Sequence, residues 1–138
     1  MMYSQNRGAA QYRAVRSHGL VADASPTRLV QIMFEQVLTN LATAGGCMGR
    51  ITNNRPLDDV TTKGRSIGKA IALIGQLNAT LDMERGGEVA ANLRSLYVYM
   101  LSRLTLANAT NDAQIVAEIS KLVREIKSGW DQIVTGAR

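Results

Sequence analysis

The sequence predicts an all-α protein, an antiparallel up-down four-helix bundle preceded by an N-terminal leader. Apolar residues recur at steps of three and four in four separate stretches, the period of a helix with one buried face. The 138 residues include two prolines, one Trp and one Phe, whereas strands favour aromatic residues and all-β domains need frequent turn residues. Short polar segments separate the stretches, which favours antiparallel neighbours around one core.

Residues 1–24 show no sustained apolar period, so we expect a leader that is mobile or docks only conditionally. The bundle is predicted to occupy residues 25–135. Its start is marked by Ser25 and Pro26. A serine hydroxyl can cap the first turn of a helix, and proline suits the first position because an N–H there has no helical partner.

The first apolar stripe predicts a helix that ends near Asn53. Its members are Leu29, Met33, Val37, Leu41, Ala44, Met48 and Ile51. Gly45 and Gly46 fall inside the stripe, and each is less favourable than alanine by about 1 kcal/mol. They could end the helix early, but Met48 and Ile51 stay in phase beyond them, which favours continuation.

Three further stripes predict three more helices. The second helix is expected to stop at the paired Gly86 and Gly87. The third is followed by Asn111 and Asp112, a capping pair that precedes the fourth. The stripes are Val60, Ile67, Ile71, Ile74 and Leu81; then Val89, Leu93, Leu96, Tyr97, Met100, Leu104 and Ala107; then Ile115, Ile119, Leu122, Ile126, Trp130 and Ile133.

The residues that usually carry catalysis or bind metal are scarce. His18 is the single histidine and lies in the leader, with no nearby carboxylate or cysteine to orient it. Cys47 is the single cysteine, so an internal disulfide and the usual metal-ligand spacings are excluded, and it is predicted to be a small core residue. A glycine-rich phosphate loop is missing as well. We therefore expect no enzyme activity, no catalytic residue, no metal and no cofactor.

The net charge of +5 and the pI near 9.8 raise the question of nucleic-acid binding. The basic residues are scattered, and the cluster of Lys63, Arg65 and Lys69 has no interleaved aromatic side chain, so a solvated face is favoured. No apolar run approaches the roughly 18 to 20 residues that span a bilayer, and the leader lacks a secretory apolar core. We expect a cytoplasmic protein that neither binds nucleic acid nor inserts into a membrane.

The second and third stripes hold more apolar residues than one buried face can take. The third stretch carries Leu93, Leu96, Tyr97, Tyr99, Met100, Leu101, Leu104 and Leu106. Because each helix of a four-helix bundle keeps an outer face, this surplus predicts a binding surface; an unusually wide core or a homodimer seam is the alternative. Gly64 and Gly68, four residues apart on the second stripe, indicate either close approach by another helix or two tolerated glycines.

Three segments carry a family resemblance: ASPTRLVQIMFEQVL at residues 24–38, SIGKAIALIGQLNATLDMERGG at 66–87, and NLRSLYVYMLSRLTLAN at 92–108. In this order they resemble the flagellar secretion chaperone family FliS, and the similarity covers nearly the whole chain after Tyr12. The resemblance implies a cytoplasmic export chaperone. Such a protein binds the disordered C-terminal segment of flagellin, prevents premature polymerisation, and delivers the client to the flagellar type III export apparatus.

The resemblance also implies an apolar groove for flagellin and a leader that covers it as a displaceable lid, with Tyr12 as the anchor. The groove candidates, some of which are expected to be plain core, are Leu29 and Met33; Ile67, Ile71 and Ile74; and Leu93, Tyr97, Met100 and Leu104. Trp130 is expected to be structural and to close the fourth helix on the bundle. The alternatives are a basic helical adaptor or regulator that binds nucleic acid or another protein, and a structural homodimer. For the chaperone itself, a weak homodimer in the absence of client is the expected self-association.

Overall fold

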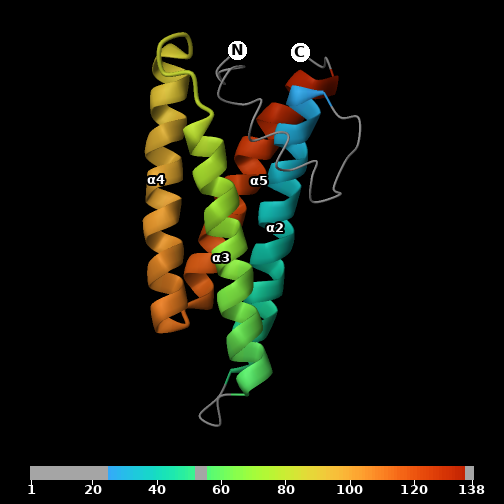
Figure 1. Cartoon of the computed structure of the whole chain (residues 1–138), viewed down its shortest axis with the longest axis vertical. Helices are drawn as coiled ribbons and strands as arrows, with labels where there is room; N and C mark the ends of the chain where they lie inside the picture. The colour runs from blue at the N-terminus through green and yellow to red at the C-terminus, as the bar shows by residue number, and fades with distance from the viewer. Residues whose placement is uncertain (1–24, 52–55, 136–138) are drawn as a thin grey trace.

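The computed structural model describes residues 25–51 and 56–135, and in these ranges the chain forms four helices that run alternately down and up (Figure 1). The all-α four-helix bundle predicted from the sequence is confirmed. Consecutive helices pack against each other, and α5 also packs along α2, which closes the bundle. The contact between α2 and α3 is the most extensive of these four, and the contact between α4 and α5 is the least extensive. The helices are α2 (Pro26–Arg50), α3 (Leu57–Ala79), α4 (Gly87–Thr110) and α5 (Ala113–Thr135).

The ends of α2 follow from its cap and its apolar stripe. Ser25 Oγ accepts a hydrogen bond from the backbone N–H of Arg28 at 3.2 Å, so the predicted N-cap is confirmed. The helix continues through both internal glycines, as expected, and ends at Arg50. Ile51 is already extended, with φ −75° and ψ 117°, so the helix stops before Asn53, which lies outside the described residues.

The predicted end of the second helix is wrong. α3 ends at Ala79, well before the paired glycines, and Gly87 with φ 54° is instead the first residue of α4. Asp82 forms the intervening turn, because its backbone oxygen accepts a hydrogen bond from the N–H of Gly86 at 2.8 Å. Leu81 lies in this connection, beyond the end of α3, yet it is buried. Because its position continues the apolar period of α3, the sequence made the helix look longer than it is.

The corner between α4 and α5 contains the predicted capping pair. Asn111 ends α4 in the left-handed conformation, and the Asp112 carboxylate accepts a hydrogen bond from the N–H of Gln114 at 3.0 Å. Lys63 reaches this corner from α3 and donates to the carbonyl of Asn108 at 3.1 Å. Lys63 is only 7% exposed. The expectation that it belongs to a solvated basic face is therefore wrong. A cation beside the last carbonyls of α4 stabilises that helix end.

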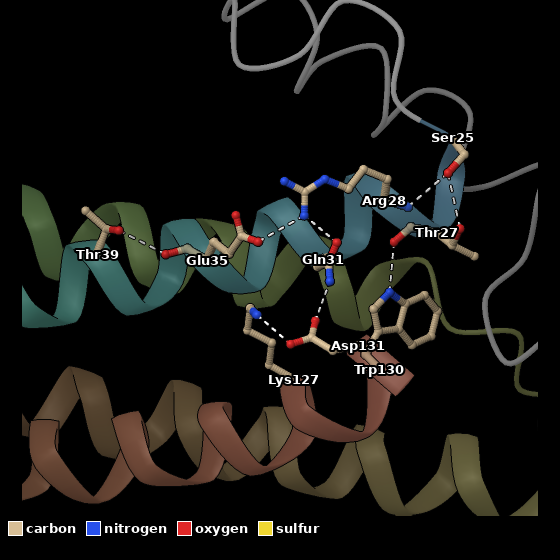
Figure 2. Close-up of polar contacts among 9 residues, drawn as sticks. All are labelled: Ser25, Thr27, Arg28, Gln31, Glu35, Thr39, Lys127, Trp130 and Asp131. Atoms are coloured by element: carbon tan, nitrogen blue, oxygen red, sulfur yellow. Dashed lines mark hydrogen bonds and ion pairs between the residues drawn. The ribbon is translucent and has the colours of Figure 1, made fainter. Parts of the chain in front are cut away.

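The last turns of α5 are fastened to the first turns of α2 (Figure 2). Trp130 is 6% exposed, and its indole Nε1 donates to the carbonyl of Thr27 at 2.8 Å. On the next residue, the Asp131 carboxylate accepts hydrogen bonds from Gln31 on α2 and from Lys127 on its own helix, the latter at 2.7 Å. Trp130 therefore lies where the sequence predicts, closing α5 onto the bundle.

Acid should weaken this contact of α5 with α2. Burial alone would raise the pKa of Asp131, but the hydrogen bonds from Lys127 and Gln31 outweigh it and lower the pKa below its ordinary value. Such a carboxyl contributes stability above its unfolded-state pKa, and this contribution is lost as the pH falls through the folded-state pKa. Because the side chain is 34% exposed, solvent screening limits the effect to about 0.5 to 1 kcal/mol.

Asp131→Asn keeps the shape of the side chain and removes its charge. Urea unfolding should therefore show the variant less stable than the parent protein near neutral pH, with the difference shrinking at about pH 3 or below. A stability difference of equal size at both pH values would show that the charge of Asp131 does not contribute to this contact.

Candidate functional site

α4 exposes more large apolar side chains than any other helix in the described part of the chain. It holds four of the seven such residues that are exposed there: Val89 at 53%, Val98 at 51%, Tyr99 at 41% and Leu106 at 44%. Leu93, Leu96 and Leu101 are half-buried beside them. We call these seven residues the α4 surface.

The position of α4 in the bundle explains this exposure. Figure 1 shows the helix at one edge, with α3 beside it and α5 turning away towards the start of α2. One side of α4 is fully buried, with Tyr97, Met100 and Leu104 at 1% exposure or less. Val98, Tyr99 and Leu106 fall at other angles around the helix and face outwards, as the surplus in the sequence predicts.

A polar link joins the middle of α4 to α5. Tyr99 Oη donates to Glu118 Oε2 at 2.7 Å, and Arg103 Nε lies 3.7 Å from the other oxygen of the same carboxylate. The hydrogen bond to Glu118, with a smaller effect of desolvation, raises the pKa of Tyr99 above its ordinary value. The hydrogen bond from the phenol links this flank of α4 to α5.

The described residues contain no group of three or more His, Cys, Asp or Glu side chains that could hold a metal ion. Cys47 is 2% exposed and packs inside the bundle, as predicted from its isolation in the sequence. Within the described ranges, no helix has the length and apolar character needed to cross a membrane. The chemistry offered by the site is thus an apolar surface bordered by a few charged and hydroxyl groups.

Over residues 8–137 the sequence matches the family described as "Flagellar protein FliS". The chain belongs to the FliS family. Among its FliS relatives, flagellar secretion chaperone FliSB of Pseudomonas aeruginosa is 45% identical over 132 residues, which cover 96% of this chain and 98% of that protein. Flagellar secretion chaperone FliS of Salmonella typhimurium is 38% identical over 133 residues, covering 96% and 93%. The protein of the same name from Vibrio cholerae is 35% identical over 128 residues, covering 92% and 89%.

The structure places the groove residues predicted from the FliS resemblance at two depths. Seven lie in the core at 1% exposure or less, namely Leu29, Met33, Ile67, Ile74, Tyr97, Met100 and Leu104. Ile71 and Leu93 are half-buried and reach the surface of α3 and α4. All nine surround one core, and their assignment to a FliS client groove stays a prediction. Tyr12, the predicted lid anchor, lies outside the described residues.

Three exposed residues of α4 that lie off the stripe are missing from the predicted FliS groove: Val98, Tyr99 and Leu106. Their signal is present in the sequence, because all three are apolar or aromatic and lie off the regular stripe of the third stretch. On α4 the bundle buries most of the stripe, although Val89 at its start is 53% exposed, whereas the off-stripe residues are left for solvent or a partner.

Proposed function

We propose that this chain is a flagellar secretion chaperone, without enzymatic activity, that binds the C-terminal segment of flagellin in the cytoplasm. Binding would keep the segment from polymerising until the flagellar export apparatus receives it. The observation that carries the proposal is the α4 surface, where Val98, Tyr99 and Leu106 are each more than 40% exposed. Several large apolar residues exposed on one helix of a small protein are typical of a site of association. The names of the similar FliS proteins support a client that is secreted by the flagellar system, and flagellin is the client that the family resemblance implies.

The physical basis is recognition of an amphipathic helix by an apolar surface. A segment that is disordered when free becomes ordered on the chaperone and buries apolar area there. The loss of conformational entropy offsets part of the favourable binding free energy. This keeps the complex reversible, as hand-off to an export apparatus requires. Half-buried Ile71 and Leu93 would contact the client directly, and the residues buried beneath them would hold the shape of the surface. Tyr12 would anchor a leader that competes for the same surface.

The C-terminal segment of flagellin should bind one-to-one and gain helix as it binds. Titration calorimetry gives the stoichiometry, and far-ultraviolet circular dichroism of the mixture should exceed the sum of the separate spectra in helical signal. Light scattering of the protein alone and with the segment provides the control for self-association. Binding accompanied by an additive spectrum would contradict the folding claim, and a dimer that persists at saturating segment would favour the homodimer alternative.

A further inference from the structure

The four main helix contacts close the bundle into a ring, and the contact between α4 and α5 is the weakest part of that ring. It is the least extensive of the four, whereas the contact between α2 and α3 is the most extensive. Figure 1 shows why: α4 and α5 start together at the corner that contains Asn111 and then diverge, because α5 crosses towards α2. A folded bundle opens most easily where two helices share the least packing.

Each of these two helices is fastened to a different neighbour. α4 is tied to α3 by Lys63, which is 7% exposed and donates to the carbonyl of Asn108 at 3.1 Å. α5 is tied to α2 by Trp130, which is 6% exposed and donates to the carbonyl of Thr27 at 2.8 Å. Separation of α4 from α5 would therefore leave both ties intact, and it would also leave the extensive contact between α2 and α3 in place.

The polar link between α4 and α5 converges on one carboxylate. Tyr99 Oη donates to Glu118 Oε2 at 2.7 Å, while Arg103 Nε lies 3.7 Å from Oε1, which is too far for a hydrogen bond. The side chains of Arg103 and Glu118 are 34% and 44% exposed. Because water can replace such contacts when the helices separate, the polar link stabilises the closed contact only modestly.

The apolar residues of α4 do not commit it to a single orientation. Met100 and Leu104 are fully buried on the inner side, but Val98 at 51% and Leu106 at 44% exposure make the outer side apolar as well. A helix with one apolar face is held in place by the burial of that face, and this constraint is weaker for a helix that is apolar on both sides. The polar link on the α5 flank therefore has a large share in fixing the position of α4.

We infer that the bundle opens locally between α4 and α5, and that the polar link of Tyr99, Arg103 and Glu118 controls how often it does so. In the open form α4 stays on α3 and α5 stays on α2, while Met100 on α4 and Ile119 on α5, both fully buried in the closed form, become accessible to water. This opening is a property of the free protein and requires no client.

Thiol labelling measures the opening directly. In a Cys47→Ala background, Met100→Cys places a buried thiol on α4 one turn before Arg103, and Val37→Cys places one on α2, where Val37 is also fully buried. Each labelling rate is divided by the rate of the same variant unfolded in urea. Under native conditions the thiol on α4 should react at least about tenfold faster than the thiol on α2, because local opening is more frequent than global unfolding.

Glu118→Gln tests the control by the polar link. It removes the charge on which both contacts of the link depend, so labelling of the Met100→Cys variant should become about three- to fivefold faster. Labelling of the Val37→Cys variant should not change. Glu125→Gln is the matched control, since Glu125 is another exposed carboxylate of α5, and it should leave both rates unaltered.

Circular dichroism verifies that each variant is folded, and Ile119→Cys replaces Met100→Cys as the reporter if the latter is not. Equal normalised rates on α4 and α2 would mean that the core opens only by global unfolding. A faster thiol on α4 that does not respond to Glu118→Gln would mean that the polar link does not control the opening. Either result would overturn the inference.

Discussion

Trp130→Ala should lower the free energy of unfolding by about 3 to 5 kcal/mol. The side chain is 6% exposed, and it is the group that brings the end of α5 onto α2. Truncation leaves a cavity at that contact and removes the hydrogen bond from the indole to the carbonyl of Thr27. Urea denaturation followed by circular dichroism measures the loss.

Trp130→Phe separates packing from hydrogen bonding at this contact. Phenylalanine keeps most of the apolar volume and lacks the indole N–H, so it should lose about 1 to 2 kcal/mol. An unchanged denaturation midpoint for Trp130→Ala, together with loss of client binding, would move Trp130 from the core to the binding surface.

Leu106→Asp should weaken binding of the flagellin C-terminal segment by roughly ten- to a hundredfold. The leucine is 44% exposed, so the free protein tolerates a carboxylate there. In the complex the same carboxylate would be buried against an apolar client surface without a partner, which is unfavourable. Calorimetry gives the affinity, and the denaturation midpoint should stay close to that of the parent protein.

Leu57→Asp is the control for the general effect of an added negative charge. Leu57 is 77% exposed at the first position of α3, where an acidic residue suits the helix dipole. Its affinity for the segment should equal that of the parent protein. Equal losses for the two variants would show that Leu106 has no specific place in the interface.

The fold was predictable because its determinants are local and periodic. The capping residues bond to backbone groups within a few residues of their own positions. The start of α2 at Ser25 and Pro26, and the α4–α5 corner at Asn111 and Asp112, could therefore be predicted without tertiary information. The end of α3 could not. It depends on the turn at Asp82, while Leu81 is held in the core by tertiary packing and continues the helical period past the true end.

The candidate site was less predictable for a related reason. Periodicity identifies the most regular apolar positions, and these are the positions that a bundle buries. Tyr97, Met100 and Leu104 were chosen as groove residues on this regularity, and the structure places them in the core. Which off-stripe residue is exposed depends on the neighbours of each helix. α4 is the edge helix because α5 leaves it for α2, and the contact of Trp130 with α2 at the end of that crossing is far away in sequence.

The same indole also serves as an optical probe. The chain has a single tryptophan, so its intrinsic tryptophan emission comes from one place, the contact between α5 and α2. A buried, hydrogen-bonded indole emits at shorter wavelength than one in water, so separation of these two helices can be followed by a red shift without any label. The α4 surface contains Tyr99 but no tryptophan. Tryptophan emission of the unmodified protein therefore follows opening of the bundle at α2 without a direct contribution from the α4 surface.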